Sequence, residues 1–233
     1  MKKLPASPFF ETSVKNYIYG QDAIDYALAV EEAANKYDVD ALFISPLTEI
    51  RTIAEKTERL IIIAAYMDPI RPGRGIADIL PEAIKAAGAH GVLLNHIEKP
   101  MSLKQIEATI IRANELDLIS FACADSIAEA RAIAQFNPDI INPEPSELIG
   151  SGQASDMTYV IKTLEEVKKV SPDILVEQAA GITKSSQIYD FIMAGNDGAG
   201  SASGILKSPD PYALLDEMIY YVSLAKKELN KVK

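Results

Sequence analysis

Eight short apolar runs recur along the 233-residue chain at fairly even spacing, and segments with helical periodicity lie between them. The runs do not alternate polar and apolar positions, and they are rich in Ile, Val, Leu and Phe. This pattern is typical of parallel strands that are buried on both faces. We expect strands over residues 9–14, 41–45, 60–66, 91–94, 118–123, 139–142, 174–178 and 198–201.

The intervening segments have Ala-rich packing faces and Glu/Lys outer faces, as amphipathic helices do. The clearest of them are residues 21–37, 103–115, 126–135, 159–170 and 211–229. Two of these helices have readable starts. Ser102 is followed three residues later by Gln105, and Asp125 stands before a segment that opens with Ser126.

Eight strand–helix units with no long linker favour a closed barrel over an open doubly wound sheet. No GxGxxG motif follows the first apolar run, which argues against a dinucleotide-binding fold. We therefore predict an α/β protein, a single (β/α)8 barrel of the TIM-barrel architecture, in one domain over residues 1–233.

Composition excludes several partners and compartments. The formal net charge of −10 repels nucleic acid and anionic membranes, so we expect neither as a partner. Cys123 is the one cysteine and cannot form an intramolecular disulfide, which fits a reducing cytosol. Residues 4–10 are interrupted by Pro5 and Pro8 and lack the apolar core of a signal peptide, and the longest apolar stretch, residues 60–67, is too short to span a membrane. We expect a cytoplasmic protein.

In a barrel of this kind, chemistry is expected at the carboxyl ends of the strands. Lys15 follows the first strand and is either a solvated loop residue or a functional cation. His96 follows the fourth strand, with Glu98 two residues on, and is either a satisfied polar residue or a functional imidazole. His90 lies in a tight turn before that strand, where we expect a structural role.

The sixth and later strands also end in candidate residues. Glu144 stands between two prolines and is followed by Gly150-Ser-Gly152, so it reads either as a catalytic base on a closing lid or as part of an ordinary loop. Small residues at 179–183 and 202–204 allow backbone N–H groups to approach an anion, at the usual phosphate site of barrels. No His/Cys/Asp cluster has metal-ligand spacing.

These segments together resemble triosephosphate isomerases, and in particular the short archaeal-type members, from about residue 9 to residue 224. The most specific segments are residues 94–98, 144–152, 180–183 and 202–204, and residues 80–88 match the helix before the fourth strand. The resemblance implies an aldose–ketose isomerase of glycolysis and gluconeogenesis that interconverts dihydroxyacetone phosphate and glyceraldehyde 3-phosphate. It also implies that the enzyme needs no metal or organic cofactor, and that it forms a homodimer or homotetramer.

The resemblance further implies roles for individual residues. The base falls on Glu144, the electrophile on His96 and the fixed cation on Lys15, with Glu98 in support, and Cys123 belongs to the core. The substrate and phosphate contacts fall on Ser13, Ile149, Gly150, Gly181, Ala202 and Ser203.

Five positions depart from the family pattern. Ser13 replaces an asparagine, Ala65 a glutamine and Ile97 a serine, and residues 76–77 are Ile-Ala in place of a Thr-Gly pair that reaches the neighbouring subunit. Loss of one partner from a buried polar network costs about 1–3 kcal/mol, so the loss of two polar partners indicates a rebuilt site.

Three hypotheses follow from these departures. The chain is an ordinary triosephosphate isomerase with a different subunit contact, or an isomerase of a four-carbon sugar phosphate, or a non-catalytic sugar-phosphate-binding paralogue. A pure binder would not need Glu144, His96 and Lys15 together, and their presence counts against the third hypothesis.

Overall fold

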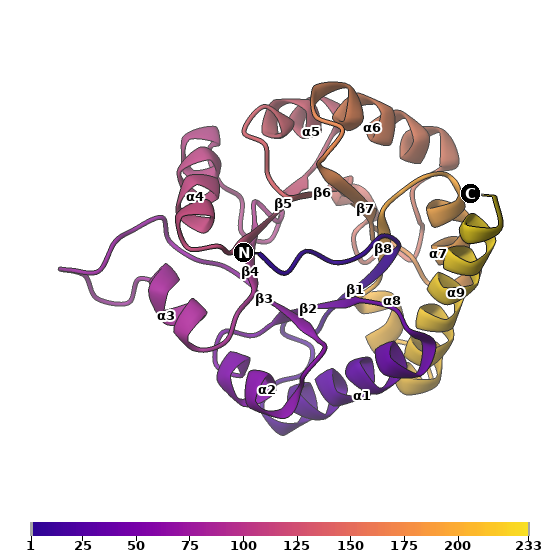
Figure 1. Ribbon diagram of the computed structural model, residues 1–233, viewed down its shortest axis with the longest axis horizontal. Helices are drawn as coiled ribbons and strands as arrows, with labels where there is room; N and C mark the ends of the chain where they lie inside the picture. The colour runs from indigo at the N-terminus through magenta and orange to yellow at the C-terminus, as the bar shows by residue number, and fades with distance from the viewer. Residues whose placement is uncertain (1, 233) are drawn as a thin grey trace.

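Eight parallel strands close into a barrel in sequence order in the computed structural model, which describes residues 2–232 (Figure 1). The predicted (β/α)8 barrel is confirmed. The strands are β1 Phe9–Ser13, β2 Ala41–Ser45, β3 Ile61–Ala64, β4 Gly91–Leu94, β5 Ile119–Ala124, β6 Ile140–Pro143, β7 Leu175–Gln178 and β8 Gly198–Gly200. The third strand is shorter than expected, since its ladder with β4 extends only over Ile63 and Ala64.

Helices surround this barrel, and the longest, α9, packs against α1 and α7 on one side (Figure 1). The helical elements are α1 Gln21–Tyr37, α2 Ile50–Lys56, α3 Pro81–Ala86, α4 Leu103–Glu115, α5 Ile127–Ala134, η1 Ser146–Leu148, α6 Met157–Val170, α7 Ser185–Met193, α8 Ser203–Leu206 and α9 Pro211–Val232. In the described part of the chain, no helix is both long and apolar enough to cross a membrane.

Side-chain hydrogen bonds fix the residues at which α4 and α5 begin. Ser102 Oγ accepts a hydrogen bond from Gln105 N, and Gln105 Oε1 accepts one from Ser102 N, so the predicted capping box of α4 is confirmed. The predicted start of α5 was wrong by one residue. Ser126 is its N-cap, because its hydroxyl reaches Glu129 N, whereas Asp125 N donates to the Glu129 carboxylate.

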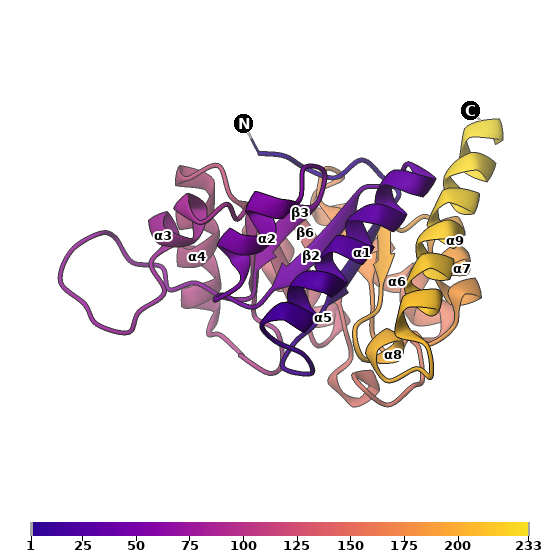
Figure 2. The same ribbon diagram turned by 90° about the horizontal axis from the view of Figure 1, so that it is seen from below.

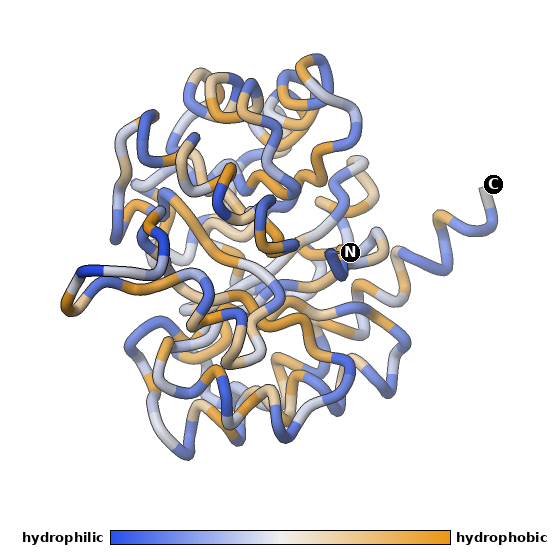
Figure 3. Tube along the Cα trace, turned by 60° about the vertical axis from the view of Figure 1, so that its left-hand side comes forward, coloured by the Kyte–Doolittle hydropathy of each residue, from blue (hydrophilic) through white to orange (hydrophobic). Residues whose placement is uncertain are grey.

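The core has two layers, one inside the barrel and one between the strands and the helices. The inner layer contains Phe9, Leu42, Ile44, Ile61, Ile63, Leu93, Ile119, Phe121, Cys123 and Ile140. Hydrophobic residues concentrate along the strands and alternate with polar ones along the outer helices (Figure 3). The buried position of Cys123 agrees with the expected core role.

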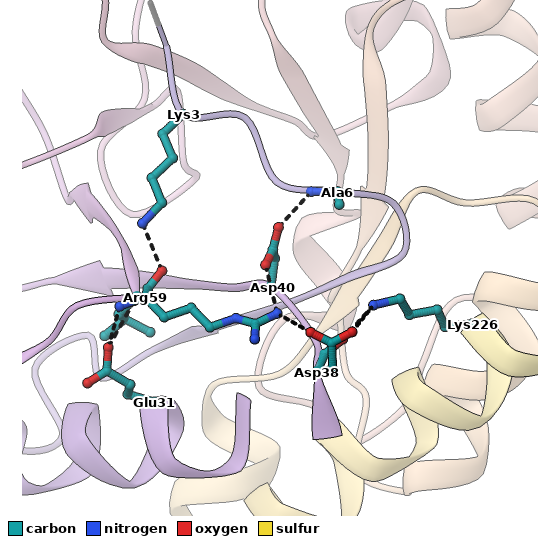
Figure 4. A network of polar contacts seen from close by, with 8 residues as sticks. Lys3, Ala6, Glu31, Asp38, Asp40, Arg59 and Lys226 are labelled. Carbon is teal, nitrogen blue, oxygen red and sulfur yellow. Dashed lines mark hydrogen bonds and ion pairs between the residues drawn. The ribbon is translucent and has the colours of Figure 1, made fainter. Parts of the chain in front are cut away.

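A polar network covers the amino ends of the strands, opposite the expected site. Arg59 Nη2 lies 3.0 Å from Asp38 and 3.2 Å from Asp40, and Lys226 of α9 lies 3.1 Å from Asp38 (Figure 4). Ala6 N donates to Asp40, so the N-terminal segment is fastened across this end of the barrel. The other end is left for the loops that follow the strands.

The longest of those loops, residues 65–80, connects β3 to α3 and projects away from the barrel (Figures 1 and 2). Asp68 holds its base, since its carboxylate accepts from Ile79 N and from Tyr66 Oη. Ile76, a residue of this loop, is 93% exposed.

Glycine on β8 is required for the inner packing. A Cβ on Gly198 would lie 2.4 Å from the ring of Phe9, which is fully buried. We expect Gly198→Ala to lower the free energy of unfolding by about 1–3 kcal/mol, measured by urea titration, because the ring has no room to move. Phe9→Leu in the same chain should recover part of the loss, and strictly additive effects of the two changes would contradict this packing.

Candidate active site

One cavity of about 460 Å³ opens at the carboxyl ends of the strands, and it is lined by every site residue expected from the sequence. These ten residues come from five separate parts of the chain. They are Ser13, Lys15, His96, Glu98, Glu144, Ile149, Gly150, Gly181, Ala202 and Ser203.

The turn after β4 fixes the direction of His96. Asn95 has a left-handed backbone with φ of 59°, and its side chain holds that turn: Nδ2 donates to Cys123 O, while Oδ1 accepts from Met101 N. A non-glycine residue in this region carries a conformational cost, so surrounding bonds must hold it there. The imidazole is thereby placed in the cavity wall, with 13% of its side chain exposed.

The tautomer of His96 follows from its partners. Nδ1 accepts a hydrogen bond of 3.1 Å from Glu98 N, which can only donate, so Nδ1 carries no proton and the neutral ring is protonated at Nε2. Burial and the nearby Lys15 lower the pKa of His96 to about 4, although Glu98 opposes them. The ring is therefore neutral near pH 7, with an N–H available at Nε2.

Lys15 is held close to that ring. Its backbone has φ of 44°, and its N–H donates to Ser13 Oγ at 3.0 Å, which turns the chain at the end of β1. Lys15 Nζ lies 3.1 Å from Glu98 Oε2 and 3.4 Å from His96 Nε2. Because Nε2 bears a proton, the second approach is a close contact between two donors and not a hydrogen bond. The sequence left two interpretations of Lys15 open. The structure places it as a cation within the cavity and not as a solvated loop residue.

Glu144 completes a cluster of three groups. Its N–H donates to Ala124 O, which anchors the residue beside β5, and its carboxylate Oε2 lies 3.8 Å from His96 Nε2. Only 11% of the side chain is exposed. Burial raises the pKa of Glu144 to about 7, while Lys15 and hydrogen bonds from Asn142 and Cys123 act in the opposite direction. A carboxylate with a pKa near 7 is suited to accept and return a proton.

The opposite wall is made largely of backbone, where the loops after β6, β7 and β8 meet. Gly181 has φ of 66°, and a Cβ there would lie 1.9 Å from Gln153 O. A Cβ on Gly204 would lie 2.0 Å from Ile182 O, which also accepts a hydrogen bond from Ser201 Oγ. Glycine is needed at both positions, and the exposed backbone N–H groups of such a wall suit an anion.

The residues that depart from the family pattern lie in different places. Ala65 and Ser13 line the cavity, whereas Ile97, which is 41% exposed, and Ile76 do not. His90 is also outside, where Nδ1 accepts from Ile62 N, as a structural residue would. In residues 2–232, no group of His, Cys, Asp or Glu side chains is placed to hold a metal ion.

Asn142 and Glu11 are among the polar residues of the cavity that sequence reasoning missed. Asn142 of β6 is buried, and its Oδ1 has no partner within residues 2–232. Glu11 of β1 is buried with 4% exposure and also lines the cavity. A signal for Glu11 was present, because an acidic residue stood inside a segment expected to be a buried strand.

Comparisons with known proteins agree with one another. A family model described as triosephosphate isomerase matches residues 8–218. The triosephosphate isomerase of Methanosarcina mazei is 34% identical over 221 residues, covering 93% of this chain and 99% of that protein. Those of Sulfurisphaera tokodaii and Methanobacterium bryantii are 35% identical over 204 residues and 33% identical over 222 residues. The matches cover 86% of this chain and 88% of the first protein, and 93% of this chain and 98% of the second.

The state of His96 can be measured directly. We expect nitrogen-15 NMR to show a neutral ring with its proton on Nε2 from pH 8 down to about pH 5, because burial and Lys15 oppose a second proton. His90 is the only other histidine, so a His90→Asn variant assigns the signals. A His96 ring that titrates near pH 6.5, or that carries its proton on Nδ1, would contradict this geometry.

Proposed function

We propose a division of catalytic roles for this chain, which belongs to the triosephosphate isomerase family. The chain is an aldose–ketose isomerase, an intramolecular oxidoreductase that interconverts dihydroxyacetone phosphate and glyceraldehyde 3-phosphate. The proposal concerns the residues that carry out this reaction. The observation that supports it is the meeting of Glu144, His96 and Lys15 at one end of a single cavity.

Glu144 is the base in this proposal. It removes the proton from the substrate carbon next to the carbonyl and returns it to the neighbouring carbon, so that an enediolate forms between the two steps. Its position beside Lys15 keeps a useful fraction ionised despite burial. The triosephosphate isomerase family is itself the standard example of a glutamate base paired with a neutral histidine.

His96 and Lys15 stabilise the charge that develops on the substrate oxygens. The Nε2–H of neutral His96 donates to the enediolate oxygens, and Lys15 supplies a fixed positive charge beside them. Glu98, through its N–H to Nδ1, holds the ring in the tautomer that this role needs. Ser13, whose hydroxyl accepts from Lys15 N, supports the lysine at the substrate end.

The phosphate group of the substrate occupies the backbone wall. Its contacts are with Ile149, Gly150, Gly181, Ala202 and Ser203. The Gly150 and Gly152 backbones have φ of 71° and 76°. Both residues lie in the loop after η1, which we assign as a lid that closes over the phosphate. The comparisons support the three-carbon reaction and favour neither the four-carbon substrate nor the non-catalytic binder.

We also propose a homodimer or homotetramer located in the cytoplasm, with residues 1–233 as one domain. The loop of residues 65–80 projects from the barrel (Figure 2) and supports the assembly, because a monomer would leave Ile76 of this loop almost completely in water.

The role of Glu144 is tested by Glu144→Gln in a coupled isomerase assay with sugar phosphates of three to five carbons. We expect kcat to fall by about 10³-fold, since the amide cannot accept a proton, while a phosphate analogue still binds. In the unchanged enzyme, kcat/KM should fall as pH drops below about 7, where Glu144 becomes protonated. Full activity in the variant would exclude Glu144 as the base.

The assembly is tested by Ile76→Asp in sedimentation velocity. A charge at this position should weaken a contact that buries this side chain and shift the protein toward monomer. Ile161→Asp, at a 41% exposed position of α6, is the matched control and should leave the assembly unchanged. A wild-type monomer that is fully active would contradict the proposed oligomer.

A further inference from the structure

Two carboxyl side chains lie inside the barrel, below the base. Glu11 of β1 stands two residues after Phe9, which belongs to the inner core, so both side chains face inward. Glu177 of β7 stands two residues after Leu175, which packs against the same core. Glu11 reaches the cavity, whereas Glu177 is fully buried and does not line it.

Strand β8 lies between the strands that carry these two residues (Figure 1). Its register pairs Gly200 with Glu11 and Gly198 with Glu177. A Cβ on Gly200 would lie 2.6 Å from Glu11 Oε2, so the carboxyl group occupies the space that a larger residue would fill. With glycine at both positions, no β8 side chain separates Glu11 from Glu177.

The surroundings of Glu177 indicate the protonation state of these carboxyl groups. Neither of its carboxyl oxygens has a hydrogen-bond partner among residues 2–232. An ionised carboxylate in that position would lose its hydration without compensation, and such a group stays protonated instead. Burial and the two nearby carboxyl groups, Glu11 and Glu144, raise the pKa of Glu177 well above its ordinary value.

Glu11 is affected by the same surroundings and sits closer to the substrate. Burial and Glu144 raise the pKa of Glu11 to about 8, and Lys15 acts in the opposite direction. Glu11 also acts electrostatically on Tyr26 of α1 and Cys123 of β5, and burial raises the pKa of both. Glu144 differs from Glu11 and Glu177 because Asn142 and Cys123 donate hydrogen bonds that favour its ionised form.

We propose that Glu11 is a positioning residue of the isomerase reaction: held in its acid form above Glu177, it keeps the cavity floor free of negative charge beside Glu144 and the anionic substrate. This inference rests on the proposed function, since it assigns Glu144 as the one buried carboxylate that must ionise. Glu11 acts through the charge balance of the site and transfers no proton to the substrate.

Ionisation of Glu11 should change KM and kcat differently as pH rises. As pH rises past the pKa of Glu11, a negative charge appears in the cavity and repels the substrate anion, so KM rises. In the complex, the bound anion raises the pKa of Glu11 further, so kcat is less affected over the same range. Above the pKa of Glu11, KM should therefore rise while kcat changes less.

The test is the ratio of KM at pH 9.5 to KM at pH 7, with glyceraldehyde 3-phosphate as substrate. We expect a ratio of about 10 for the unchanged enzyme, corresponding to repulsion worth about one pKa unit, and a several-fold smaller ratio for Glu11→Gln, in which only the ionisation of Glu144 remains. Glu177→Gln is the matched control, equally buried and nearly isosteric. It should keep most of the rise, because burial of Glu11 and its closeness to Glu144 are unchanged.

Infrared spectroscopy of the unchanged protein is a second test, and it requires neither catalytic turnover nor a folded variant. Infrared spectra of the unchanged protein should contain protonated carboxyl bands at pH 7. The absorption that remains at pH 8, where Glu144 is largely ionised, should decrease further by pH 9.5 as Glu11 ionises. The proposal is overturned if no protonated carboxyl is present at pH 7, or if Glu11→Gln retains the tenfold ratio. These outcomes differ from failure of the proposed function, which would appear as activity in Glu144→Gln.

Discussion

The burial of ionisable side chains at the carboxyl end of the barrel is the constraint on which the rest of this site depends. Closure of eight strands brings side chains from distant parts of the chain into one poorly solvated space, where ionised groups are unfavourable unless they are paired. Lys15 supplies the opposing charge, and it lowers the pKa of two of its neighbours. It favours the ionised form of Glu144 and disfavours a second proton on His96. One cation therefore helps to prepare both the base and the electrophile.

The large features of the fold and of the site were predictable because they depend on local patterns. Runs of apolar residues indicated each strand, and alternation with helices indicated closure into a barrel. The carboxyl ends of parallel strands meet at one end of a barrel, so Lys15, His96 and Glu144 were expected together, and they line the same cavity. Their catalytic roles rest on resemblance and on this geometry, and stay predictions until the variants are measured.

What the sequence did not reveal depends on three-dimensional partners. The acidic residues Glu11 and Glu177 were not singled out, because only strand register shows that both pair with glycine positions of β8. The turn at Asn95 depends on a carbonyl from β5, 28 residues away. The start of α5 was misplaced because Asp125 and Ser126 are both good caps, and only the path of the chain decides which reaches Glu129 N.

The central claim is that the hydrogen moves as a proton, through an enediolate, by way of Glu144. The most direct measurement is the conversion of dihydroxyacetone phosphate in deuterium oxide, with the product analysed by NMR. The account predicts deuterium at the carbon that receives the proton, because the carboxyl of Glu144 exchanges with solvent before it returns its proton. Product formed at full rate without any deuterium would mean direct hydride transfer between the carbons, and would contradict the account.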